Sequence, residues 1–148
     1  MIRVHGTSVA LDAGGVLLRG PSGSGKSDLA LRLVDAGARL VADDQTELHR
    51  IGDALDLRAP FALKGLIEVR GLGIVRVPAA DRARLRLVVD LVGEDVIERM
   101  PEPRFVTLEG LSFPLLALAP FAASAAAKLR LALRALAGAD VVAGMAAP

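Results

Sequence analysis

Near the start of the chain, eight consecutive residues have the types and spacing needed to hold a polyphosphate. They fit the pattern G-x-x-x-x-G-K-[ST], in which backbone N–H groups surround the phosphates. Lys26 would contact the β- and γ-phosphates, and the Ser27 hydroxyl would bind Mg²⁺. The residues expected to bind the nucleotide are Gly20, Pro21, Ser22, Gly23, Ser24, Gly25, Lys26 and Ser27.

The residues on either side place this loop between a strand and a helix. Residues 16–18 form a short β-prone apolar run, and residues 29–34 carry apolar side chains at helical spacing before the stop signal Gly37. A strand, a glycine loop and a helix start aim free N–H groups and the positive end of a helix dipole at one volume. A glycine-rich turn that matches by chance is the alternative, and the two flanks favour the nucleotide site.

A nucleotide site of this kind also needs carboxylates for the metal and for the attacking group. One apolar run ends in the pair Asp43-Asp44, and another ends in Asp90. We favour the pair because a strand that follows the first helix often lies beside the strand ahead of the loop, and two acids can divide metal and proton duties. A turn with a capping residue is the alternative for the pair. For Asp90 a plain strand-end aspartate is as good an interpretation as a metal ligand.

Three further side chains are candidates. Glu68 and Arg70 lie two positions apart in a β-like run, so they share one face. Such a pair is more often a solvated ion pair, but the neighbouring glycines let a backbone approach a ligand closely. By itself, His5 is better interpreted as a neutral polar residue on an edge strand.

Strands outnumber helices in the rest of the chain. We expect a strand over 85–91, a helix over about 26–36, and a second helix from a Ser124 cap to about Leu136. Because the strands are joined by turns rather than by alternating helices, the pattern predicts an α/β fold with a mixed β-sheet and few helices. Glycine-containing turns predict hairpins within 3–19, 47–57 and 105–113, and residues 66–77 form two β-like runs separated by a Gly-Leu-Gly break.

Composition limits the class of protein. A chain of 148 residues, 53% of them hydrophobic, is expected to form one domain over residues 1–148, with a small apolar tail from about residue 137 that is disordered or an interface. A net charge of +1 with dispersed arginines argues against nucleic acid, and the lack of cysteine excludes thiol chemistry. The first residues lack the apolar core of a signal peptide, so we expect a cytoplasmic protein with no membrane association.

Four segments together resemble the successive motifs of the HPr kinase/phosphorylase family. They are His5-Gly6 and residues 20–27, 39–44 and 66–74, in the same order and with similar spacing. The stretch Glu-Val-Arg-Gly-Leu-Gly discriminates best, because phosphate-binding loops of this pattern occur in many families. The resemblance is strong over residues 3–77 and loose beyond, and it is to the catalytic domain of a family whose members usually carry an additional N-terminal domain.

The resemblance implies an activity and a role for each candidate. Family members use ATP, or in some cases pyrophosphate, with Mg²⁺ to phosphorylate a serine of the phosphocarrier HPr of the phosphotransferase system, and they can reverse the reaction by phosphorolysis. Asp43 would be the general base that takes the serine proton and the acid that returns it, and Asp44 would assist in metal or water positioning. Glu68 would bind the metal, Arg70 the phosphate groups, and His5 would lie at the active site.

The resemblance also implies a fold related to the nucleotide domain of phosphoenolpyruvate carboxykinase, and a homo-oligomer, a hexamer in the family. The region 115–120 lacks the arginine-bearing loop that the family places ahead of its last helix. Two other functions stay open. One is a small-molecule kinase, although no arginine-bearing helical lid is found, and the other is a non-catalytic nucleotide-sensing adaptor.

Overall fold

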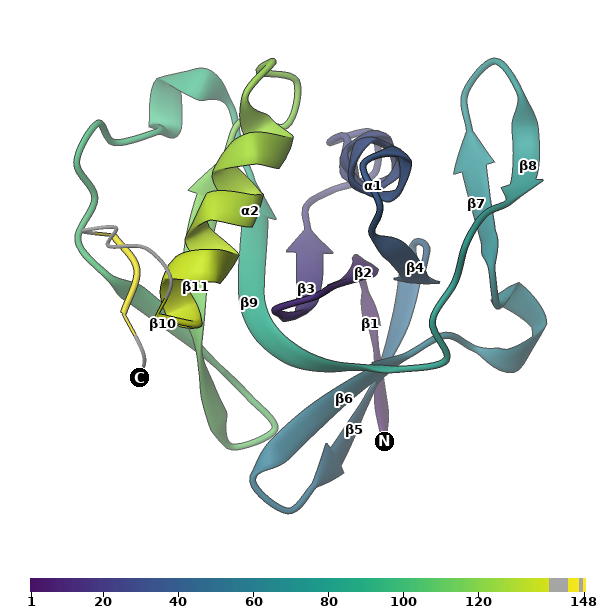
Figure 1. The fold of residues 1–148 in the computed structure, drawn as a ribbon, viewed down its shortest axis with the longest axis horizontal. Coiled ribbons are helices and arrows are strands. Elements are labelled where there is room, and N and C mark those ends of the chain that lie inside the picture. Colours follow the sequence, from purple (N-terminus) through teal and green to yellow (C-terminus); the bar gives the residue numbers. More distant parts are fainter. Residues whose placement is uncertain (139–143, 147) are drawn as a thin grey trace.

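The computed structural model describes residues 1–138, 144–146 and 148. Most of the apolar tail expected from about residue 137 therefore lies outside the described residues. In the described part, helices α1 (Lys26–Asp35) and α2 (Ala125–Leu136) pack against one face of a curled β-sheet (Figure 1). Two short 3₁₀ helices, η1 (Phe61–Leu63) and η2 (Glu94–Val96), lie in connections. The expectation of a mixed sheet with few helices is confirmed.

The main sheet brings several strand ends to one edge. Its strand order is β1-β5-β6-β9-β3-β2-β4, with β11 added to β9 and β10 outside β11. Strands β3, β9 and β11 run parallel, and β2 is antiparallel to both β3 and β4. The carboxyl ends of β3, β4, β9 and β11 and the start of β2 therefore share one edge. The strands are β1 (Ile2–His5), β2 (Thr7–Leu11), β3 (Gly14–Arg19), β4 (Arg39–Ala42), β5 (Gln45–Ile51), β6 (Ala54–Arg58), β7 (Leu66–Val69), β8 (Gly73–Arg76), β9 (Ala83–Leu91), β10 (Arg104–Leu108) and β11 (Leu111–Leu118).

The three predicted hairpins are confirmed as the antiparallel pairs β2–β3, β5–β6 and β10–β11, and the two β-like runs within 66–77 also pair antiparallel, as β7–β8. Their turns carry glycine where the backbone needs a positive φ, as at Gly52 (φ 63°) and Gly110 (φ 78°). Local turn chemistry thus specifies these pairings. The helices also lie where the sequence predicts them, although Ser124 caps α2 without a side-chain hydrogen bond.

The first arm of the hairpin expected within residues 3–19 is divided into two strands, because the chain breaks at Gly6. Strand β1 pairs with β5, whereas β2 pairs with β3 and β4. A Cβ at Gly6 would lie 2.9 Å from Leu17 Cδ1 and 3.0 Å from the Leu18 carbonyl oxygen. Glycine therefore lets the chain cross closely over β3 as it passes from one part of the sheet to the other.

The expectation that β4 lies beside β3 is also wrong. The β2–β3 hairpin fills one side of β3 and β9 fills the other, so β4 pairs with β2 instead. The carboxyl end of β4 still reaches the same sheet edge, because two antiparallel steps restore its direction. The acid pair is thus offset from the loop by one intervening strand.

Buried apolar clusters cover both faces of the sheet. One lies under the helices and includes Leu29 and Leu33 of α1 with Leu129 and Leu133 of α2. The other lies against the opposite face and includes Leu48, Leu55 and Leu57 from the β5–β6 hairpin. Adjacent residues of β3 point to opposite clusters, as strand geometry requires. This two-sided packing fixes β3 and α1, the elements that flank the glycine loop.

The β7–β8 hairpin forms a separate two-stranded sheet beside α1 (Figure 1). Ile67 is 1% exposed and packs in the same cluster as the core of α1, whereas Leu72 and Ile74 near the tip are exposed. One buried face therefore holds the hairpin against the body. None of the helices in the described residues is long and apolar enough to span a membrane.

Glu47 on β5 ties β1 to the sheet through a pH-dependent contact. Its carboxylate is hydrogen-bonded to His49 Nε2 and accepts from the Arg3 guanidinium, each at 3.1 Å. These bonds, the one to His49 first, hold the pKa of Glu47 below its ordinary value. A carboxyl whose folded pKa is lowered contributes stability above its unfolded pKa and loses it as the pH falls through the folded pKa.

We therefore expect Glu47→Gln to flatten the loss of stability below about pH 4.3, by under about 1 kcal/mol. Thermal unfolding followed by circular dichroism from neutral to acid pH measures this effect. Exposed Glu102, replaced by Gln, is the matched control. The same pH dependence in the Glu47→Gln and wild-type proteins would contradict the role given to Glu47.

Candidate functional site

A cleft of about 420 Å³ opens at the sheet edge above the start of α1. Its walls come from the glycine loop, the end of β4, the end of β7 and the loop ahead of α2. The structure thus brings together segments that are far apart in the sequence. Of the residues predicted from the sequence, the cleft is lined by Ser22, Gly23, Gly25, Lys26, Ser27, Asp43, Asp44, Glu68 and Arg70.

The glycine loop uses backbone conformations and close contacts that favour glycine. Gly23 (φ 81°) and Gly25 (φ 100°) are in the left-handed region. A Cβ at Gly20 would lie 2.5 Å from Ser24 Oγ, so this position also accepts only glycine without a shift. Ser24 Oγ itself is buried and has no hydrogen-bond partner within the described chain. The loop is therefore tightly wound against its own side chains.

Lys26 is 6% exposed and braces the loop from inside. Its Nζ donates to the carbonyl oxygens of Gly20 at 2.7 Å and Pro21 at 3.0 Å. An ammonium has three N–H donors, so one remains for a ligand. Gly25 caps α1 without a side-chain hydrogen bond, so the first N–H groups of the helix face the cleft without a side-chain cap. Together these donors and the helix dipole can bind an anion.

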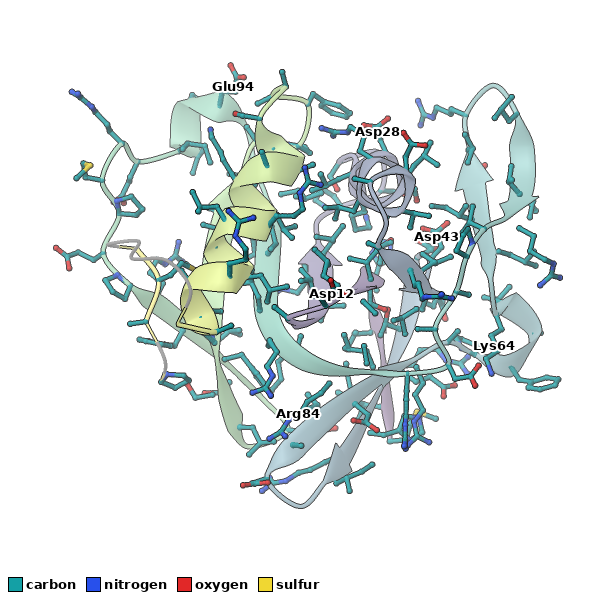
Figure 2. All side chains as sticks on the ribbon, viewed as in Figure 1. Asp12, Asp28, Asp43, Lys64, Arg84 and Glu94 are labelled. Carbon is teal, nitrogen blue, oxygen red and sulfur yellow. The ribbon has the colours of Figure 1, made fainter. Side chains whose placement is uncertain are left out.

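At the cleft, Asp43 is hydrogen-bonded to residues of three elements, β2, α1 and β7 (Figure 2). Its Oδ1 accepts from the Ser27 hydroxyl at 2.6 Å and from the Thr7 hydroxyl at 3.1 Å. Its Oδ2 accepts from the backbone N–H of Glu68 at 3.1 Å. A carboxylate offers about four lone-pair positions, so roughly one remains for an incoming proton donor. The carboxylate is held in one orientation at the start of α1.

Asp44 is held in an unusual backbone conformation, with φ at 64°. Its N–H donates to Thr7 Oγ1 at 3.1 Å, and its carbonyl accepts from the Gly6 N–H at 2.9 Å. His5 Nε2 lies 2.8 Å from Asp44 Oδ1. His5 is exposed and does not itself line the cleft, so its connection to the site is this contact with Asp44.

Thr7 is the functional candidate that the sequence did not reveal. It is fully buried, and its hydroxyl connects Asp43 to the backbone of Asp44. The contact spans more than 35 positions and depends on β2 lying between β3 and β4. The only sequence signal is its place directly after His5-Gly6, where the chain breaks between two strands.

Asp90, the alternative carboxylate, forms an ion pair with Arg19 outside the cleft. Arg19 Nε donates to its Oδ1 at 2.8 Å and Arg19 Nη2 to its Oδ2 at 3.1 Å. The two residues are register partners at the ends of the parallel strands β3 and β9. This two-bond ion pair joins the strand ahead of the loop to its neighbour and lies outside the cleft lining. The geometry therefore favours the Asp43-Asp44 pair over Asp90 as the carboxylates for metal and proton duties.

Glu68 and Arg70 line the cleft from the end of β7, and both are exposed. Among the described residues, no three His, Cys, Asp or Glu side chains lie close enough to hold a metal by themselves. Protein sites for Mg²⁺ usually supply one or two oxygen ligands and leave the rest to substrate phosphates and water. The Ser27 hydroxyl and the Glu68 carboxylate, facing one cleft beside an anion cradle, suit such a shared site.

Comparison with protein families gives one extended match. Residues 1–99 match the family model described as the HPr Serine kinase C-terminal domain. This match covers every predicted site residue and Thr7, and it ends before the loop ahead of α2.

Individual relatives agree with the family match. The HPr kinase/phosphorylase of Aromatoleum aromaticum is 42% identical over 135 residues, which cover 82% of this chain and 43% of the relative. That of Clostridium acetobutylicum is 46% identical over 77 residues, 52% of this chain and 25% of the relative. This chain therefore spans less than half the length of these relatives.

A solved structure described as the Hpr(Ser) kinase/phosphatase from Coxiella burnetii has a similar fold. It aligns with a TM-score of 0.76 at 25% identity, over 88% of this chain and 96% of the solved chain. The similarity therefore extends over nearly all of both chains.

Proposed function

The chain belongs to the HPr serine kinase C-terminal domain family, and from that premise we propose that it is an ATP- and Mg²⁺-dependent kinase acting on a serine of an HPr-type phosphocarrier. One observation carries the proposal. A carboxylate, Asp43, is held by Thr7, Ser27 and the Glu68 N–H at the mouth of a phosphate cradle. Phosphoryl transfer depends mostly on positioning and charge neutralisation, and this arrangement supplies both.

The cradle would bind the polyphosphate. The phosphates carry negative charge. They would be held by backbone N–H groups of residues 23–27, by the start of α1 and by the remaining N–H of Lys26. The exposed Arg70 guanidinium on the opposite wall would contact the outer phosphate oxygens. These groups hold the terminal phosphate in front of Asp43.

Asp43 would act as the general base. The serine oxygen forms a bond to the γ-phosphorus, the bond from phosphorus to the β–γ bridging oxygen breaks, and the serine proton passes to the Asp43 carboxylate. In the reverse reaction, an oxygen of inorganic phosphate would bond to the phosphoserine phosphorus to form pyrophosphate, the bond from that phosphorus to the serine oxygen breaks, and Asp43 returns the proton to the serine oxygen. The hydrogen bonds from Thr7, Ser27 and Glu68 keep the accepting carboxylate in place throughout. Asp44, held by His5, would position water or the metal.

Mg²⁺ fits the donors at this site, with the Ser27 hydroxyl and the Glu68 carboxylate as protein ligands. Bound there, it would neutralise charge on the phosphate oxygens. Because Ser27 also contacts Asp43, the same side chain links the metal ligand set to the proton acceptor.

Family membership supports three further proposals. Residues 1–148 form one catalytic domain related to the nucleotide domain of phosphoenolpyruvate carboxykinase, pyrophosphate can replace ATP as donor, and the protein is a homo-oligomer. Light scattering on the purified protein measures the last of these directly.

The test of function is the intact mass of a purified HPr-type phosphocarrier after incubation with this protein and Mg-ATP. A carrier whose target serine is replaced by alanine is the matched control. We expect a gain of one phosphoryl group on the serine carrier alone. Addition to the alanine carrier would contradict the assignment of a serine acceptor.

Two outcomes would favour the other functions. Nucleotide binding with no transfer to any carrier would favour a nucleotide-sensing adaptor. Turnover of a small metabolite without a protein acceptor would favour a small-molecule kinase. Failure to bind any nucleotide would remove all three functions.

A further inference from the structure

We propose that Phe121 is a stacking surface for the purine base of the bound nucleotide, and that Arg32 and Asp28 position the loop that carries it. The inference rests on the proposed function in that it requires a nucleotide in the cleft. Phe121 lies beyond position 99, where the family match ends, and directly after the region 115–120 that lacks an arginine-bearing loop.

Phe121 is 70% exposed, although it is a large apolar side chain next to a polar cleft. It lines the cleft, and its ring lies close against the glycine loop. A Cβ at Gly25 would be 2.9 Å from Phe121 Cζ and 3.1 Å from Pro120 Cβ, so glycine is what allows the ring to sit there. One edge of the ring is thus fixed by the cradle, while most of the side chain remains accessible to a ligand.

The order of strands puts this ring and the catalytic carboxylate on opposite sides of the cradle. Along the sheet edge, β4 with Asp43 lies on one side of β3, and β11, which leads to Phe121, lies on the other. Figure 1 shows α1 between the loop ahead of α2 and the β7–β8 hairpin. A nucleotide whose terminal phosphate lies at Asp43 can therefore extend across the start of α1, which brings its base to Phe121.

A second contact holds the loop in place. The Arg32 guanidinium donates to the carbonyl oxygen of Pro120 and, at 3.5 Å, to that of Ala122, the two residues that flank Phe121. Arg32 is itself oriented by Asp28, whose Oδ2 lies 3.1 Å from Arg32 Nε. Both Asp28 and Arg32 belong to α1, the helix that begins at the cradle. The ring is therefore positioned relative to the phosphates before any ligand arrives, which lowers the entropy cost of binding.

The chemistry of this wall suits a flat aromatic ligand. A base stacks on an aromatic face regardless of its hydrogen-bonding pattern, so the contact serves adenine and guanine alike. Leu31 adds apolar surface to the same cleft. A polyphosphate without a base would gain nothing from Phe121, and this difference separates a base contact from support of the cradle.

The test is calorimetric titration of the full chain, with Mg²⁺ present, against ATP and against tripolyphosphate. For Phe121→Ala we expect ATP affinity to fall roughly ten-fold and tripolyphosphate affinity to stay unchanged. Phe121→Tyr keeps the ring and should bind ATP as the wild type does. Phe61→Ala, which removes another exposed ring outside the cleft, is the matched control and should change neither affinity.

The outcomes separate this inference from the proposed function. ATP binding by Phe121→Ala at wild-type strength overturns the inference and leaves the kinase proposal intact. An equal loss for ATP and tripolyphosphate also overturns it, because the ring would then support the cradle. A wild-type protein that binds neither ligand overturns both. Retained tripolyphosphate binding by Phe121→Ala shows in the same experiment that the variant is folded.

Discussion

Asp43→Asn is expected to abolish phosphoryl transfer while nucleotide binding stays within a few-fold of the wild type. General-base catalysis contributes about 10²- to 10⁴-fold in rate, and an amide cannot accept the serine proton. The proposed phosphate contacts come from backbone N–H groups of the loop and from Lys26, whereas the contact of Asp43 with α1 is to the Ser27 hydroxyl. The transfer rate, measured from carrier mass over time, and the dissociation constant for Mg-ATP should therefore respond very differently.

The substitution is well suited to the structure around it. An asparagine can turn its amide oxygen toward the Glu68 N–H and its NH₂ group toward the hydroxyls of Thr7 and Ser27, which can accept as well as donate. The fold and the cleft should therefore survive. Asp53→Asn, in the exposed turn of the β5–β6 hairpin, is the control for loss of a carboxylate. Transfer by Asp43→Asn at the wild-type rate would rule out the proposed role of Asp43.

Lys26→Met is expected to weaken ATP and tripolyphosphate equally, by about 10- to 150-fold. Hydrogen bonds to charged groups contribute about 1.5–3 kcal/mol each. The substitution removes the proposed hydrogen bond from the Lys26 ammonium to a phosphate oxygen. It also removes the donor to the carbonyls of Gly20 and Pro21, so the loop loses its internal brace. Methionine keeps the length and flexibility of the buried stem, which is 6% exposed, so packing should be preserved.

Calorimetry with both ligands measures this effect, and Lys128→Met on the exposed face of α2 is the matched control. The equal loss for both ligands distinguishes Lys26 from Phe121, for which only ATP should be affected. Unchanged affinities would mean that the ammonium serves only the loop carbonyls.

The sequence predicted those parts of the fold that local signals specify. The hairpins follow from alternating strands and glycine turns, and α1 follows from its apolar spacing between the glycine loop and Gly37. The order of strands was not predictable in the same way. Whether β4 lies beside β3 depends on which strand the β2–β3 hairpin leaves exposed, and no local signal encodes that choice.

For the candidate site, too, local motifs were predictable from the sequence and long-range contacts were not. Residues that match motifs, such as Asp43 and Arg70, were found because each lies within a recognisable segment. Thr7, Arg32 and Phe121 became candidates only with the strand order and the packing of α1, because their contacts join segments far apart in the chain. Asp90 likewise could be separated from the acid pair only when its register with Arg19 was known.

Among the described residues, the β7–β8 hairpin itself has no ladder of backbone hydrogen bonds to the main sheet, and the segment after it bonds to β4 through the Leu40 N–H to the Pro78 carbonyl and the Ala80 N–H to the Leu40 carbonyl, each at 2.9 Å. The hairpin is closed at its root by the Val77 N–H to the Gly65 carbonyl at 3.1 Å, and it is held to the body by buried Ile67 and by the bond from the Glu68 N–H to Asp43. A two-stranded hairpin alone is marginally stable in water, so local opening costs less here than in β3 or β9. Glu68 and Arg70 therefore belong to a less stable cooperative unit than the cradle does, and they move away from Asp43 together when that unit opens.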